Sequence, residues 1–219
     1  MKRKEFFMTL ELQPYQYMQL KAIIYNLIDN YKSVNDHRTV DAVQSLAVEQ
    51  IHQIVPTPTP EIEDLISFAL DHQVRREATD RYFETFKAHV VGFAQPSKKQ
   101  VEKVFRKVKK LKQPDFEGID LREHTYVGWN DLGTRRKYLL YYTDGKLAGL
   151  NGDLSATVIK GFCAICHQEG NVSLFTAISK TGGDGRYTKK GNYICTDSDQ
   201  CNRQLYRRED FDQFLRDIK

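Results

Sequence analysis

The sequence predicts an α+β protein with two folded units, an antiparallel helical bundle over residues 1–95 and a mixed α/β unit over residues 96–219. The chain has 219 residues, more than a usual single domain, and its 40% hydrophobic and 11% aromatic content is enough to build cores. Apolar residues recur with a helical period before Pro96 and with strand-like patterns after Pro114. All four cysteines fall within residues 163–201.

Four helical patterns account for the first unit. The first begins at Pro14, since proline is tolerated in the first turn of a helix, and runs to Tyr31. The second begins after Asn35 or Asp36, either of which can cap it, and ends before the proline run at Pro56. Helices with apolar residues on one side, joined by short connections, predict an antiparallel bundle. The remaining two patterns have these apolar positions: Ile62, Leu65, Ile66 and Phe68, then Val74, Tyr82, Phe83, Phe86 and Val90.

A basic helix is expected over residues 97–112. It opens with a serine and has Gln100 three positions later, which fits a capping box, and apolar positions recur from Val101 to Leu111. Eight lysines and arginines occupy the rest of the segment. The stripe, with Phe105 in it, is interpreted as packing on a sheet. The alternative is a helix that lies along phosphates.

Strand patterns occur after Pro114. Residues 138–142 and 147–150 flank Asp144-Gly145, a dipeptide that favours tight hairpin turns, so they predict a β-hairpin. The last segment, residues 207–218, has a helical period again. Further strand candidates are residues 157–159, 173–178 and 193–195.

The charge of the chain is unevenly distributed. Residues 1–96 hold 10 lysines and arginines against 13 acidic residues, a net charge of −3, whereas residues 97–219 hold 23 against 16, a net charge of +7. A basic unit is suited to an acidic partner, either nucleic acid or an acidic protein surface, and charge does not distinguish the two.

Localisation in the cytoplasm is expected. The apolar run Phe6-Phe7-Met8 is too short for the core of a signal peptide, and the charged Glu11 comes soon after it. No apolar run approaches the roughly 20 residues needed to cross a bilayer. We therefore expect no membrane partner.

The cysteines form two close pairs, Cys163-x-x-Cys166 and Cys195-x5-Cys201, separated by 28 residues. Two pairs of this kind can close a tetrahedral zinc site, because each short turn presents two sulfurs to one ion. Four thiolates leave no open position for a water, so the ion is expected to be structural. His167 could replace a cysteine in principle, although a surface position is the preferred interpretation.

Three other interpretations of the cysteines are possible: disulfides, a redox motif, or four ordinary buried thiols. A reducing cytoplasm disfavours disulfides, and a thioredoxin-like site does not need a second pair. No catalytic set is visible, since the six histidines are scattered and the glycine cluster at residues 182–185 lacks the Gly-Lys-Ser/Thr ending of a phosphate-binding loop. That cluster is interpreted as a hairpin tip. The sequence favours a binding module over an enzyme.

Several motifs resemble the zinc-binding region of the FusB-type elongation factor G-binding proteins, which confer fusidic acid resistance. The resemblance covers nearly the whole chain, strongly in its C-terminal half and loosely before Pro60. The matching motifs are Lys160-Gly161-Phe162-Cys163-x-x-Cys166, Asn171 to Phe175, Lys189-Lys190-Gly191-x-Tyr193-Ile194-Cys195, Cys201-Asn202, Val127 to Asn130, Lys103 to Lys110 and Tyr31 to Asp36.

The resemblance implies both a fold and a function. The implied fold is a helical bundle joined to a mixed domain with a four-cysteine zinc finger. The implied function of the zinc-finger domain is to bind elongation factor G and to promote its release from a drug-stalled ribosome. The implied zinc ligands are Cys163, Cys166, Cys195 and Cys201, and the implied partner contacts are Phe162, Lys190, Tyr193 and Phe214. The alternative is a zinc-containing nucleic-acid-binding protein that acts on ribosomal RNA.

Overall fold

The computed structural model describes residues 9–34, 36–180 and 187–218. The chain divides into two compact units, Met1–Val91 and Gly92–Lys219, with the division a few residues before the boundary expected from sequence. Asn35 and the glycine cluster at residues 182–185 lie outside the described residues.

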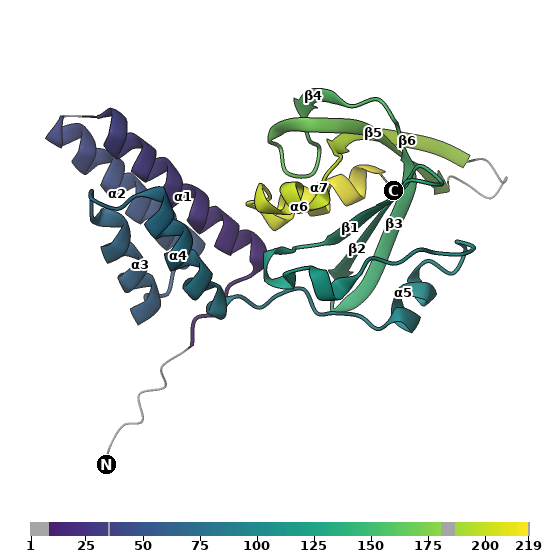
Figure 1. The fold of residues 1–219 in the computed structure, drawn as a ribbon, viewed down its shortest axis with the longest axis horizontal. Helices are drawn as coiled ribbons and strands as arrows, with labels where there is room; N and C mark the ends of the chain where they lie inside the picture. Colours follow the sequence, from purple (N-terminus) through teal and green to yellow (C-terminus); the bar gives the residue numbers. More distant parts are fainter. Residues whose placement is uncertain (1–8, 35, 181–186, 219) are drawn as a thin grey trace, which may run out of the picture. The chain divides into compact units, whose positions relative to one another are not determined.

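Over its described residues the first unit is a bundle of four α-helices, as predicted, and Figure 1 shows them in purple and blue. Pro14 opens the first helix, and the carboxylate of Asp36 caps the second by accepting from the Thr39 N–H at 3.0 Å. Among the described residues, no helix has the length and apolarity of a membrane span. The bundle consists of α1 Pro14–Ser33, α2 His37–Ile54, α3 Pro60–Leu70 and α4 Arg76–Phe86.

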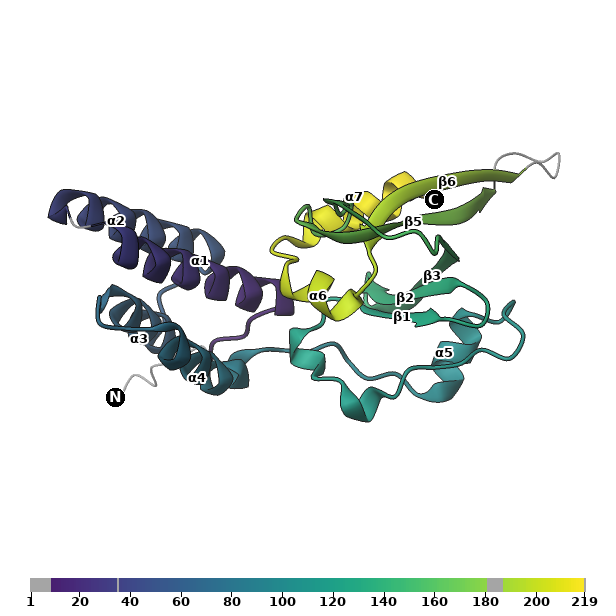
Figure 2. The same cartoon turned by 45° about the horizontal axis from the view of Figure 1, so that its top comes forward.

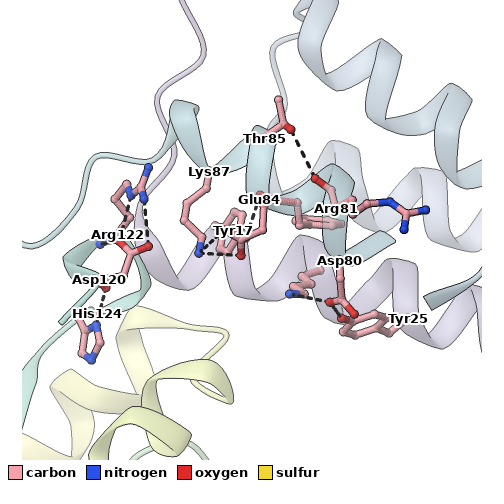
Figure 3. A network of polar contacts seen from close by, with 12 residues as sticks. Tyr17, Tyr25, Asp80, Arg81, Glu84, Thr85, Lys87, Asp120, Arg122 and His124 are labelled. Atoms are coloured by element: carbon pink, nitrogen blue, oxygen red, sulfur yellow. Dashed lines mark hydrogen bonds and ion pairs between the residues drawn. The ribbon is translucent and has the colours of Figure 1, made fainter. Parts of the chain in front are cut away.

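The bundle has its own apolar core, and hydrogen bonds and an ion pair add to it. The buried Tyr17 hydroxyl donates to the Phe83 carbonyl at 3.0 Å, which joins α1 to α4 across the core. Figure 3 shows the polar contacts along α4, where the ammonium of the buried Lys87 lies 3.0 Å from the Glu84 carboxylate. The Tyr25 hydroxyl on α1 donates to the carboxylate of Asp80 on α4. The two tyrosine hydroxyls hold α4 against α1, whereas the Lys87–Glu84 pair lies within α4 and the turn that follows it.

The second unit is an antiparallel sheet with helices on both of its faces. The strands lie in the order β1-β2-β3-β5-β4, and β6 pairs with the other edge of β5. Figure 2 shows α6 and α7 together on the inner side of the curled sheet, with α5 near β3. The elements are α5 Lys98–Val104, β1 Val127–Asp131, β2 Arg136–Thr143, β3 Lys146–Leu154, β4 Ile159–Phe162, β5 Glu169–Lys180, β6 Tyr187–Cys195, α6 Ser198–Arg203 and α7 Arg208–Ile218.

The predicted hairpin is confirmed as β2–β3. Its turn residues Asp144 and Gly145 have φ of 49° and 68°, so both lie in the left-handed region that a type I′ turn requires. The terminal helix α7 is confirmed as well. The sequence did not predict β1, because Gly128 and Asn130 within it are poor strand formers.

The basic helix is shorter than predicted. It ends at Val104, and Phe105 leaves the helical region with φ of −102° and ψ of 33°. The side chains expected in the stripe still cover the sheet, with Phe105 buried against β3 where Gly149 leaves room for its ring. Like charges four apart, such as Lys103 and Lys107, weaken a continued helix, and the docked ring fixes the chain in another path.

Strand β2 separates two cores. Leu139 and Tyr141 face α6 and α7, while Tyr138 and Leu140 face α5 and the loops around it. Side chains on successive strand residues point to opposite faces, so a strand that is apolar on both sides must be covered twice. The first of these cores contains all four cysteines.

Candidate metal centre and its surface

The four cysteines come together from three places in the fold. Cys163 and Cys166 lie in the turn between β4 and β5, Cys195 ends β6, and Cys201 is on α6. Their sulfurs lie within 4.8 Å of one another, and all four side chains are buried. The predicted constellation is therefore assembled.

The first pair is held by a tight turn with inward-pointing amides. The His167 N–H donates to the Cys163 carbonyl at 2.9 Å, and His167 has φ of 56°, which reverses the chain. The N–H groups of Ile165 and Cys195 both donate to the Cys163 sulfur at 3.3 Å. The His167 side chain is exposed and lies outside the sulfur cluster, as expected from sequence.

The second pair owes its wide spacing to a helix start. After Cys195 the chain turns through Thr196, and the Asp197 carboxylate caps α6 by accepting from the N–H groups of Asp199 and Gln200. The Cys201 N–H then donates to the Asp197 carbonyl at 3.2 Å. Five residues are thus needed to turn the chain and bring Cys201 back to the site.

The sulfur geometry fits a zinc ion. Four ligands at the usual Zn–S length of about 2.3 Å, placed at the corners of a tetrahedron, are about 3.8 Å apart. The Cys163 and Cys201 sulfurs are 3.8 Å apart, and so are those of Cys166 and Cys195. A disulfide requires about 2.05 Å, so these are four free thiols arranged around one point.

The surroundings of the sulfurs suit negative charge. The Tyr126 hydroxyl is buried and has no hydrogen-bond partner of ordinary geometry among the described residues, yet it lies near enough to Cys201 for that sulfur to act on it. Burial, together with Cys201, raises the pKa of Tyr126 well above its usual value. A thiolate ligand would supply the acceptor that this hydroxyl lacks.

Asn202, next to the last ligand, ties α6 to the start of β1. Its side-chain oxygen accepts from the Thr125 N–H at 2.8 Å, and its side-chain nitrogen donates to the Tyr126 carbonyl at 2.9 Å. Asn202 is 1% exposed, so these bonds are made inside the core. They fix the helix that carries Cys201.

Gly128 on β1 makes room for the first residue of α6. A Cβ at this position would lie 2.3 Å from the Ser198 oxygen and 2.8 Å from its Cβ. We expect Gly128→Ala to lower the free energy of unfolding of this unit by about 1–3 kcal/mol, because overpacking displaces α6. Urea unfolding of the variant beside Gly118→Ala, where a Cβ would meet nothing within 4 Å, checks this. Equal stabilities would contradict it.

Two of the predicted partner contacts are exposed aromatic side chains. Phe162 directly precedes Cys163 and is 73% exposed, and Tyr193, two residues before Cys195, is 45% exposed. The Ala164 N–H donates to the Tyr193 carbonyl at 2.8 Å, so the two chain segments are joined beside the metal centre. Lys190, also predicted, is half-buried on β6.

The sequence reasoning missed an apolar neighbour. Leu174 on β5 stands directly opposite Tyr193 on β6 and is 37% exposed. Opposite residues of an antiparallel pair lie on one face of the sheet, so the two side chains form a continuous surface. We group Phe162 with these two residues because it is exposed and adjoins the ligand Cys163, although the register pairs it with Glu169, and we call Phe162, Leu174 and Tyr193 the finger patch. A leucine within an apolar strand gives no sign in the sequence that it faces outward.

Phe214 corrects one expectation. It is 1% exposed, and its ring packs between those of Phe175 and Phe211, with centroids 6.2 Å and 6.5 Å away. The apolar stripe of α7 faces the core, so this side chain is not available on the surface as a partner contact. Its place is behind the sheet that carries the finger patch.

Comparisons with known proteins agree with this architecture. Residues 11–94 match the family model "Elongation factor G-binding protein, N-terminal", and residues 99–216 match "FBP C-terminal treble-clef zinc-finger". A solved structure described as the fusidic acid resistance protein FusC superposes with a TM-score of 0.88 and 36% sequence identity, over 97% of this chain and 99% of that one. A search of curated proteins finds no match. The chain belongs to the FusB-type elongation factor G-binding protein family.

Proposed function

We propose that this protein binds elongation factor G through its C-terminal unit, promotes release of the factor from the drug-stalled ribosome, and so protects translation from fusidic acid. The supporting observation is the finger patch, which exposes two aromatic rings beside a metal centre in a chain 36% identical to FusC. We place the protein in the cytoplasm, where its partner acts.

One structural zinc ion per chain is part of the proposal. Aromatic residues dominate the energetics of many protein interfaces, and they bind most tightly when they are held in place beforehand. A zinc ion bound by Cys163 and Cys195 would fix the segments that carry Phe162 and Tyr193. Lys190 would add a charged contact at the margin of the patch. The protein would thus act by binding and not by catalysis.

Release of the factor sets a thermodynamic condition. A ligand shifts an equilibrium only by the difference between its affinities for the two states. The protein must therefore bind the free factor more tightly than the ribosome-bound factor, or bind an intermediate on the way out. The direct experiment measures the dissociation rate of labelled factor from ribosomes with fusidic acid at rising protein concentration. A rate that does not change would refute release as the mechanism.

A second candidate partner is RNA, which the exposed lysines of residues 98–112 favour. The salt dependence of the binding affinity distinguishes an RNA partner from a protein partner. Binding that neutralises phosphates loses affinity with a log–log slope of about −0.7 to −0.9 per contact. An interface centred on Phe162, Leu174 and Tyr193 should have a shallow slope, since apolar anchors supply most of its energy. Titrations at several salt concentrations with elongation factor G and with ribosomal RNA check this. Tighter, steeply salt-dependent binding to RNA would favour the second candidate.

A further inference from the structure

Lys137 is a buried lysine that the proposed function does not use. It lies on β2 and is 1% exposed, among the largest fully buried side chains of the described residues. Its ammonium donates to the Asn130 side-chain oxygen at 3.2 Å and to the Thr196 carbonyl at 3.0 Å. Both acceptors are neutral, and no carboxylate in the described part of the chain pairs with this ammonium.

A buried ammonium without a counter-charge is costly. Moving an ion out of water is unfavourable unless an opposite charge lies close by, and two neutral acceptors compensate only part of the cost. In natural proteins a buried ammonium is usually paired with an opposite charge. The structure therefore calls for an anion near Lys137.

The cysteine cluster lies close to Lys137 in the fold, and its thiolates can supply the negative charge. The Thr196 carbonyl that accepts from Lys137 belongs to the residue directly after Cys195. Lys137 also points to the same side of β2 as Leu139 and Tyr141, which belong to the core that contains the cysteines. Burial lowers the pKa of Lys137, and the Cys201 and Cys195 sulfurs, the Asp197 carboxylate and the Cys163 sulfur all oppose this effect, with Cys201 the largest of the four.

The charges complement one another. A zinc ion carries two positive charges and four thiolates carry four negative ones, so the group as a whole is doubly negative. A cation beside this group stabilises the doubly negative complex relative to the metal-free site, because the cysteines take up protons when the ion leaves and the cation then loses its counter-charge. The N–H groups directed at Cys163 act in the same sense, but they are dipoles and not charges.

We propose that Lys137 is the internal counter-cation of the tetrathiolate centre, and that its charge sets how slowly the metal is released. Lys137 is thus a positioning residue that acts through the ligands. The inference rests on the proposed zinc site but not on the identity of the partner. It assigns a role to a lysine that directly precedes the predicted strand at residues 138–142, where a solvent-facing charge is the ordinary interpretation.

The test compares zinc release from four proteins that start with the metal bound. The wild type, Lys137→Met, Lys137→Gln and Arg136→Met are mixed with the chromogenic chelator 4-(2-pyridylazo)resorcinol, and the rate of zinc transfer is followed. Lys137→Met keeps the length of the side chain and removes its charge, while Lys137→Gln keeps a hydrogen-bond donor. Arg136 is the matched control, because it is the neighbouring cation, is partly exposed and pairs with Asp153.

We expect Lys137→Met and Lys137→Gln to release zinc roughly tenfold or more faster than the wild type, because the buried positive charge that stabilises the doubly negative complex is lost. Arg136→Met should stay within about twofold of the wild type, since an exposed ion pair contributes little. Rates for both Lys137 variants equal to the wild type would overturn the inference. Full rescue by Lys137→Gln alone would overturn it too, because a hydrogen bond would then suffice.

A spectroscopic readout separates charge from packing. In cobalt-substituted protein, loss of a cation near the thiolates should move the sulfur-to-cobalt charge-transfer band to longer wavelength, because the sulfur electrons are then held less tightly. A merely structural role leaves the band in place. If Lys137→Met does not fold, Lys137→Arg and Lys137→Gln decide: we expect slow release with the first and fast release with the second, and equal rates would reject the inference. Absence of zinc from the wild-type protein would instead refute the proposed metal site.

Discussion

Cys195→Ser is expected to abolish tight metal binding and to unfold the C-terminal unit, while the helical bundle stays folded. Cys195 ends β6 and lies in the core with the other three ligands, and it is 3% exposed. Structural zinc sites contribute about 10–16 kcal/mol of apparent binding free energy, comparable to the whole stability of a domain. Most of this is lost when one of four ligands is weakened.

The two units report separately in this experiment. The bundle has its own core around residues such as Tyr17 and Phe83, so its helical circular dichroism should persist at temperatures where the near-ultraviolet signal of the second unit is lost. Metal analysis and thermal unfolding are measured on the same samples. His167→Asn is the matched control, because it changes an exposed neighbour of the ligands to another residue that tolerates positive φ. Cys195→Ser protein with full zinc content and wild-type melting would refute the metal site.

Tyr193→Ala and Phe162→Ala are expected to weaken binding of elongation factor G by about 30-fold or more each, as alanine replacement of an interface anchor commonly costs about 2 kcal/mol or more. Phe162 is largely exposed and Tyr193 is partly exposed in the unbound protein, so folding should lose less than it would at a core site. Lys190→Ala should weaken binding as well, with zinc content and melting temperature close to those of the wild type. Calorimetric titration and melting curves on the same variants measure both effects.

Two controls complete the comparison. Leu132 is 88% exposed in the β1–β2 turn, away from the cysteines in sequence, so Leu132→Ala removes exposed apolar surface outside the finger patch and should bind normally. Phe214→Ala should behave in the opposite way to Tyr193→Ala, with a loss of about 3–5 kcal/mol in folding stability. If the Tyr193, Phe162 and Lys190 variants all bind as the wild type does, the finger patch is not the interface.

Local patterns in the sequence were sufficient for most of the fold. The prolines, the cap at Asp36, the Asp144-Gly145 turn and the cysteine spacing each depend on residues near one another in the chain, and the structure confirms all of them. Propensity and turn chemistry act over a few residues, so they can be read from the sequence.

The features that the sequence did not predict depend on distant contacts. The early end of α5 results from Phe105 docking where Gly149, on β3, has no side chain. The family resemblance implies a partner contact at Phe214, although its position in the α7 stripe indicates burial. Lys137 is recognised as buried only when β2 is seen to be covered by α6 and α7. Such tertiary coverage has no local signal.

Direct binding of elongation factor G by the finger patch of the metal-bound protein is decided by calorimetry. Purified factor is titrated with the zinc-loaded protein at physiological salt, and Tyr193→Ala protein with the same zinc content is run beside it. We expect a saturable one-to-one complex with the wild type and binding about 30-fold or more weaker with the variant. Absence of binding by the zinc-loaded wild type, or equal affinity for the two proteins, would contradict binding through this patch.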